Sequence, residues 1–137
     1  MKIALIIAAF LIALILLSFE IMMHMVLGRK RSLNPSKPAK DSIFETDQYR
    51  SDMKSMMEWT RSGTLHHIMS KDHLMLSAYL HRRSSHMYFI TMHGYRGNAW
   101  ENGMIAKHFS DNGWNVLSLV DRAHKGSDGR WITMGAM

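Results

Sequence analysis

The amino-terminal segment constrains the fold most, because residues 3–19 contain no charged side chain. With Glu20 and His24 accommodated near one end, the apolar stretch extends over residues 3–27. At about 1.5 Å per residue, the charge-free part of a helix would span roughly 26 Å and the longer version roughly 37 Å, against a hydrocarbon core of about 30 Å. We therefore expect one helix that crosses a lipid bilayer through residues 3–27.

A cleaved signal peptide is the main alternative, since Lys2 followed by an apolar run is its usual opening. The residues after Leu17 are Ser, Phe, Glu, Ile and two Met, which do not form the small-x-small site that signal peptidases prefer. The sequence thus favours an uncleaved, single-pass anchor in the cell membrane. The cations within residues 29–40 place the carboxyl-terminal part in the cytoplasm, whereas signal-anchor logic points the other way, so the side of the membrane stays open.

Composition excludes several classes of function. The chain has 137 residues and a net charge of +6, from 17 Lys and Arg against 11 Asp and Glu. Several of these cations follow the apolar segment, and no nucleic-acid-binding module accompanies them, so the charge indicates membrane flanking and no nucleic-acid partner. The absence of cysteine removes disulfides, thiolate metal sites and a cysteine nucleophile.

The chain divides into a transmembrane anchor at residues 1–28, a basic, proline-containing linker at residues 29–45 and a folded part at residues 46–137. The folded part has room for one domain at most. It begins with an amphipathic helix, predicted over residues 47–61, that packs on the domain or on the bilayer surface. Its stripe consists of Tyr49, Met53, Met56, Met57 and Thr60.

After this helix the spacing of apolar residues changes from that of a helix to that of strands. Residues 65–69 are a short strand candidate, residues 74–80 alternate as a half-buried second strand should, and a polar turn follows. Residues 87–92 form a third, continuously apolar strand, which predicts burial on both faces in the centre of a sheet.

A helix with clear end signals follows this third strand. Asn98 can cap it, Glu101 can reach back as in a capping box, and Asn112-Gly113 supplies a left-handed stop. Residues 114–120 are apolar enough for a fourth strand, and we expect them to present an apolar exposed edge. Strand, helix and strand with short connections predict a βαβ unit with parallel strands. The helix face expected to pack on the sheet consists of Trp100, Met104, Ile105, His108 and Phe109.

Two motifs follow the strands of this unit: His93-Gly94-Tyr95-Arg96-Gly97-Asn98, and Asp121-Arg122-Ala123-His124-Lys125-Gly126-Ser127. In these motifs the chain resembles the amino-terminal half of α/β-hydrolase fold enzymes, and more narrowly the membrane-anchored bacterial serine hydrolases of the esterase, lipase and aminopeptidase-like group. In that family a strand leads into a His-Gly-x loop, and the strand after the next helix ends in an Asp-x-Arg-x-His-Gly-x-Ser-like loop. The resemblance covers about residues 65–135, and the second motif departs from the family in its spacing and glycine position.

The resemblance implies an α/β fold class: the amino-terminal part of an α/β-hydrolase sheet, with three to four strands and one crossover helix, behind a single transmembrane helix. It implies that the backbone N–H of Tyr95 is one of two oxyanion donors for a small acyl substrate. The partner donor would follow a nucleophilic serine, yet no Gly-x-Ser-x-Gly segment occurs in the chain. The residues expected to support the loops are His93, Gly94, Gly97, Asp121, Arg122 and His124.

Other candidate groups have simpler explanations. Ser127 lies in a Gly-Ser-Asp-Gly segment that lacks the nucleophile spacing, so we expect it to cap or close a turn. The nine histidines show no metal-ligand spacing, and we expect neither a metal nor a cofactor.

These features favour an amino-terminal fragment of a membrane-anchored serine hydrolase, which carries the oxyanion loop without the Ser-Asp-His triad and is inactive alone. The alternative is a small membrane-tethered binding or interaction protein that uses a hydrolase-derived half-domain as a scaffold. A third hypothesis is an enzyme completed by a separately encoded second half. Ester and amide substrates are not distinguished.

Overall fold

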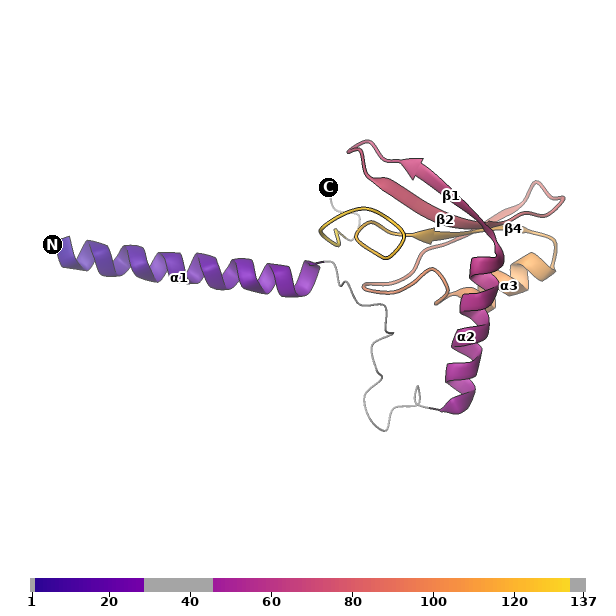
Figure 1. Ribbon diagram of the computed structural model, residues 1–137, viewed down its shortest axis with the longest axis horizontal. Coiled ribbons are helices and arrows are strands. Elements are labelled where there is room, and N and C mark those ends of the chain that lie inside the picture. Colours follow the sequence, from indigo (N-terminus) through magenta and orange to yellow (C-terminus); the bar gives the residue numbers. More distant parts are fainter. Residues whose placement is uncertain (1, 29–45, 134–137) are drawn as a thin grey trace.

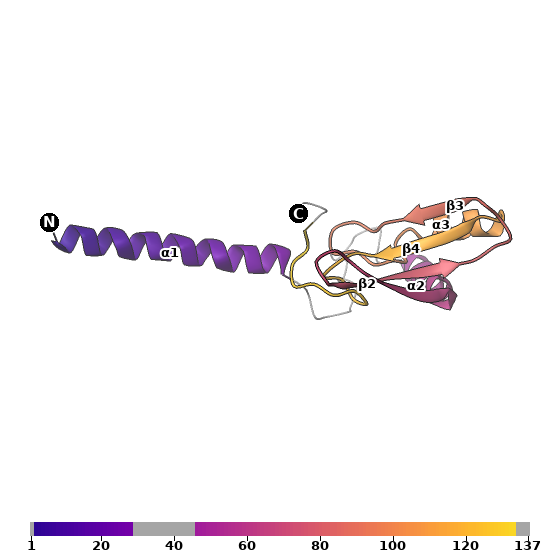
Figure 2. The ribbon, with the colours of Figure 1, turned by 90° about the horizontal axis from the view of Figure 1, so that it is seen from above.

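The computed structural model describes residues 2–28 and 46–133 (Figure 1). Helix α1 (Lys2–Leu27) is a single long helix that extends away from the rest of the protein, as two perpendicular views show (Figures 1 and 2). Its segment Leu5–Leu27 is long and apolar enough to cross a membrane, and none of it is buried within the protein. Because a signal sequence shares these properties, α1 is an amino-terminal apolar helix that fits either a membrane anchor or a signal sequence.

The folded part contains a mixed four-stranded sheet in the order β1-β2-β4-β3. Strands β1 and β2 are antiparallel, as are β2 and β4, whereas β3 and β4 are parallel. Helix α3 connects the two parallel strands, which confirms the predicted βαβ unit. The bounds are β1 (Thr64–Met69), β2 (Met75–His81), β3 (Tyr88–Thr91), α3 (Gly103–Asp111) and β4 (Asn115–Val120).

The positions of β3 and β4 in the sheet are the reverse of the prediction. Strand β4 is central, between β2 and β3, and four of its six residues are buried. Strand β3 lies at the edge of the sheet that the structure describes, and Ile90 is 58% exposed. The predicted burial of β3 on both faces is therefore wrong. Among the described residues, no element covers its outer edge or the face that carries Ile90.

Helix α2 (Asp47–Ser62) confirms the predicted amphipathic helix and packs on the domain, against α3 and β2. It begins at Thr46, whose hydroxyl accepts a hydrogen bond of 3.2 Å from the Tyr49 N–H. Near its carboxyl end, Trp59 stacks on His81 of β2 with the ring centroids 4.0 Å apart. Because α2 and α3 contact both each other and the sheet, the two helices cover the same sheet face.

Helix α3 begins later and faces differently than predicted. The helix starts at Gly103, after two tight turns. The residue before it, Asn102, does not cap the helix with its side chain, because that side chain donates to the Met92 carbonyl at 2.7 Å. The buried face consists of Gly103, Ala106 and Ser110, whereas Met104 is 67% exposed.

The buried face carries small side chains because α2 lies very close to it. A Cβ on Gly103 would lie 2.7 Å from the Met56 Cβ of α2. Of the predicted face, Phe109 contacts the sheet, where it stacks on Phe89 of β3 with a centroid separation of 4.0 Å. The large apolar residues Met104 and Ile105 remain exposed.

Candidate functional site

The two sequence motifs meet at one edge of the sheet. Residues 93–98 follow β3 and residues 121–127 follow β4, and parallel neighbouring strands bring their carboxyl ends to the same edge. This is the edge at which open α/β sheets bind ligands. Figure 2 shows the arrowheads of β3 and β4 pointing toward this end of the molecule.

His93 joins the two loops. The Asp121 backbone N–H donates to His93 Nε2 at 3.2 Å, so Nε2 is an acceptor and the ring proton of the neutral imidazole sits on Nδ1. That Nδ1–H donates to the Gly94 carbonyl at 2.9 Å, and an Asp121 carboxylate oxygen lies 3.9 Å away. The side chain is almost fully buried. His93 thus links the first loop to the end of β4.

His124 packs on this link from the second loop. Its ring meets the His93 ring edge-on, with the centroids 4.3 Å apart, and its Nδ1 lies 2.9 Å from the Arg122 carbonyl. Burial lowers the pKa of His124 below the ordinary value of 6.5, so the ring is neutral at pH 7. A neutral ring in this place packs and donates a hydrogen bond, and it brings no charge to the site.

Ser127 is committed to holding the second loop. It is 2% exposed, its hydroxyl donates to the Val120 carbonyl at 2.6 Å, and it accepts from the Ser77 N–H at 2.8 Å. Ser77 and Val120 are register partners on β2 and β4, so the hydroxyl bridges the last rung of that ladder. Such a serine lies in a closed turn and not on the exposed strand-to-helix turn that presents a nucleophile.

The remaining shape of the second loop comes from positive backbone φ angles at Ala123 (60°), Gly126 (109°) and Gly129 (122°). At Gly129 a Cβ would lie 2.7 Å from the Ala123 nitrogen, so this glycine permits a close backbone approach. Arg122 forms an ion pair of 2.9 Å with Asp72 on the β1–β2 turn. Hydrogen bonds lower the pKa of the Asp72 carboxyl, the largest contribution coming from the Ser70 hydroxyl and smaller ones from a backbone N–H and from Arg122.

The first loop leaves its backbone accessible beside Gly94. The Gly97 N–H donates to the Gly94 carbonyl at 2.9 Å and closes a turn, with Arg96 at a φ of 57°. A Cβ at Gly94 would meet no atom within 4 Å. Within residues 2–28 and 46–133, the Tyr95 N–H has no hydrogen-bond acceptor. The loop therefore leaves the Tyr95 N–H without an acceptor among the described residues, next to a glycine position that no atom crowds. An oxyanion donor needs an N–H that is not already bonded.

A cavity of about 90 Å³ lies between the two loops. This volume corresponds to roughly three water molecules. The first loop contributes residues 97–100 and the second residues 124–126, so Gly97 and His124 lie at the cavity. The other predicted site residues, Tyr95 included, are not part of its lining: His93, Gly94, Tyr95, Asp121 and Arg122. Sequence reasoning missed Arg61, whose guanidinium lies 5.0 Å from the Trp100 ring centroid and helps to line the cavity, because a residue at the end of a helix carries no motif.

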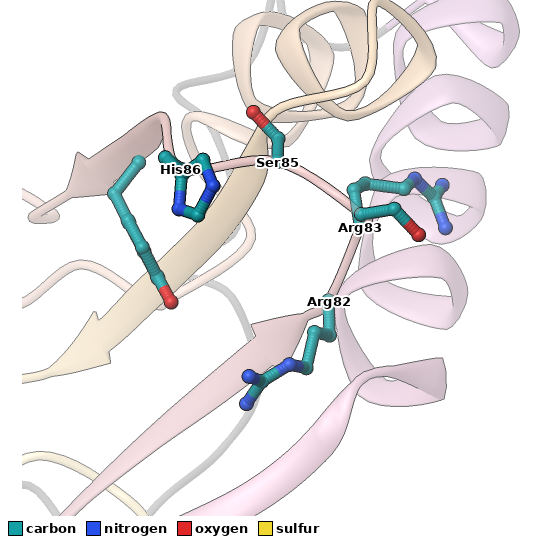
Figure 3. A pocket seen from close by; sticks show the side chains of 6 residues that line it. Arg82, Arg83, Ser85 and His86 are labelled. Carbon is teal, nitrogen blue, oxygen red and sulfur yellow. The ribbon is translucent and has the colours of Figure 1, made fainter.

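A larger, open groove of about 670 Å³ lies at the opposite end of the sheet, on the connection between β2 and β3 (Figure 3). Its cations include Arg82 and Arg83. The Arg83 Nε–H donates to the Ser110 carbonyl at 3.0 Å, at the carboxyl end of α3, and its backbone N–H donates to the Asn115 side chain at 2.7 Å. Arg83 thus stabilises a helix end, and this groove shares no residue with the two motif loops.

No group of three or more His, Asp or Glu side chains within the described ranges could hold a metal ion. No family model matches the chain, and no curated protein sequence matches it. Among solved structures the chain is similar to an esterase from Pyrococcus furiosus, with 27% sequence identity and a TM-score of 0.46. The similarity covers 61% of this chain and 32% of the esterase, so the chain spans about a third of that protein's length.

Proposed function

We propose that this chain supplies the amino-terminal part of a membrane-anchored α/β-fold serine hydrolase, which carries one oxyanion donor of an acyl-transfer site. The observation that carries the proposal is the Tyr95 N–H beside open space at Gly94, at the carboxyl end of a parallel strand. In α/β hydrolases the loop after the third strand and before the first crossover helix supplies one oxyanion N–H, and here that loop follows β3 and precedes α3.

Chemically, the loop would stabilise the negative charge that develops on a carbonyl oxygen during attack on an ester or amide. Donors act on this charge when they are already positioned, and a rigid loop avoids reorganisation at the moment of reaction. The buried His93 link to Gly94 and Asp121 supplies that rigidity. The second donor, the nucleophile and its base would come from polypeptide outside these residues, because no Gly-x-Ser-x-Gly segment occurs and Ser127 is buried.

The proposal predicts that the full chain in lipid nanodiscs does not hydrolyse a short-chain aryl ester above the buffer rate. It also predicts that a fluorophosphonate, which reacts with activated serine, leaves every serine unmodified in mass spectra. Hydrolysis that disappears in the Gly94→Val variant but persists in a matched exposed variant, Ser84→Ala, would overturn the proposed absence of a nucleophile.

A second candidate function, a membrane-tethered interaction protein, is favoured by the open edge of the sheet. Ile90 of β3 and its neighbour Leu117 of β4 are register partners and lie on the sheet face opposite the helices. Tyr88 and Ile90 are exposed, and a strand edge of this kind pairs readily with another strand. A cooperative thermal transition of residues 41–137 expressed alone would support a self-sufficient scaffold, whereas a molten or insoluble product would exclude it.

A further inference from the structure

The carboxyl end of α1 is attached to the loops of the candidate site. The last carbonyls of a helix have no partners within the helix. Here the Arg96 guanidinium donates to the Val26 carbonyl at 2.8 Å and also contacts the Met25 carbonyl, while the Tyr95 hydroxyl donates to Val26. The Ile132 N–H donates to the Leu27 carbonyl at 2.8 Å. These bonds come from the loop after β3 and from the segment that follows the second loop.

This attachment fixes the direction in which the site faces. The folded part lies beyond one end of α1 (Figure 1). Figure 2 shows the arrowheads of β3 and β4 pointing toward that end of α1. A bilayer crossed by α1 would therefore lie on the side of the carboxyl ends of β3 and β4. The groove of Figure 3 lies at the opposite, amino-terminal end of β3 and would face away from the lipid.

The side chains around the helix end have the chemistry of a lipid headgroup region. We call Tyr95, Arg96, Lys125, Arg130 and Trp131 the collar. The Arg96 guanidinium lies 5.2 Å from the Tyr95 ring centroid, the Arg130 guanidinium lies 5.3 Å from that of Trp131, and Lys125 is exposed. Tyrosine and tryptophan favour the membrane interface, and arginine and lysine near it attract anionic lipids.

Two acidic groups, Asp121 and the exposed Asp128, lie near the collar and offset part of its charge, but the collar's three cations outnumber them. Asp121 lies beside the His93 ring, and the Asp128 carboxylate accepts the Met75 N–H at 3.0 Å. Trp131 also contacts α1 directly, with its ring 4.4 Å from the His24 ring. The collar is thus continuous with the end of the apolar helix. In the sequence, three further cations, Arg29, Lys30 and Arg31, follow this helix directly.

We propose that the collar is a lipid-binding surface that holds the loops of the candidate site against the headgroups of anionic phospholipids. The inference rests on α1 spanning the bilayer and does not require the chain to take part in acyl transfer. Its ligand is the phosphate of a bilayer phospholipid, bound by guanidinium and ammonium groups.

The test uses the full chain in nanodiscs of phosphatidylcholine, with or without phosphatidylglycerol. The chain has no cysteine, so Met92→Cys or Ser84→Cys each provides one site for a single fluorescent label. Met92 is exposed at the site end of β3, and Ser84 is exposed at the opposite end of the sheet. Lipids spin-labelled at the headgroup should quench the label at Met92 more than the label at Ser84. Phosphatidylglycerol should increase that quenching, and high salt should reverse the increase.

Charge reversal separates the collar from general attraction of the chain to the membrane. Arg130→Glu changes the surface charge by two units, which corresponds to roughly a 30-fold loss in the docking equilibrium at about 1 kcal/mol per charge. Arg82→Glu is the matched control, because Arg82 is equally an exposed arginine but lies at the far end. Lys125→Glu provides a second collar variant, and tryptophan fluorescence checks that each variant folds. Equal quenching at the two labels, no effect of phosphatidylglycerol, or equal effects of the Arg130 and Arg82 variants would overturn the proposal.

Discussion

Ser127→Ala should destabilise the folded part strongly, although the change removes one oxygen atom. The Ser127 hydroxyl bridges the Ser77 N–H of β2 and the Val120 carbonyl of β4, at 2.8 and 2.6 Å, in a site that is 2% exposed. Alanine leaves both backbone groups without this partner, and a buried polar group left unsatisfied costs about 1–3 kcal/mol. We therefore expect a loss of about 2 kcal/mol in the free energy of unfolding.

For a folded part of this size, that loss corresponds to a decrease in Tm of roughly 8–16 °C. Thermal melting of the full chain in nanodiscs, followed by tryptophan fluorescence, measures it. All four tryptophans follow the linker, and three of them, Trp59, Trp100 and Trp114, lie in the helices, strands and loops of the folded part, so the signal reports mainly on that part. The matched control is Ser84→Ala, at an exposed position, which should leave the Tm unchanged. A Tm of Ser127→Ala that equals that of Ser84→Ala would refute the bridging role of this hydroxyl.

Three further predictions follow from the packing and the charges. Gly103→Ala should cost about 1–3 kcal/mol of stability because its Cβ would overlap Met56, while Gly94→Ala, which meets nothing within 4 Å, should melt like the parent. The free energy of unfolding should fall as the pH drops below about 6.5, because burial lowers the pKa of His81 and His124 in the folded state and the unfolded state then binds protons first. In melts at a series of pH values, His81→Gln should reduce the dependence of stability on pH. An unchanged pH dependence would contradict the assignment to His81. Because the edge strand β3 is apolar and exposed, we expect the protein to self-associate in light scattering, and Ile90→Lys should reduce this association by placing a charge on the exposed face; undiminished association would show that this face is not responsible.

The elements of the fold were largely predictable from the sequence. Alternation and turn residues indicated β1 and β2, and helical spacing indicated α2, because each signal lies within a few neighbouring residues. The sheet order was not predictable in this way. Apolarity placed β3 in the centre and β4 at the edge, yet the backbone pairing makes β4 central. The apolar content of a strand indicates that its faces can be buried, but it does not show which neighbouring strand or helix covers them.

Helix α3 shows a second limit of sequence patterns. Periodicity gives weight to large apolar residues such as Met104 and Ile105, but α2 lies so close that Gly103, Ala106 and Ser110 form the buried face. Asn98 does not cap this helix as expected, because the helix begins at Gly103 and Asn102 occupies the position before it. The Asn102 side chain bonds the Met92 carbonyl, just after β3.

In the site, the motifs identified both loops, whereas the contacts between the loops were visible only in three dimensions. The Asp121 N–H and His93 ring are 28 residues apart in the chain, and the docking of Arg96 on the end of α1 joins residues 70 apart. No local pattern of residues records pairings of such range.

The most direct test of the central claim, an oxyanion donor at the Tyr95 N–H, is an NMR titration of the ¹⁵N-labelled full chain in nanodiscs with butyrate. The carboxylate stands in for the oxyanion of an acyl-transfer intermediate. The account predicts that the Tyr95 amide signal shifts with saturation while the Gly97 amide, which already donates to the Gly94 carbonyl, stays in place. A Tyr95 signal that does not move, or that moves no more than the Gly97 signal, would contradict the claim.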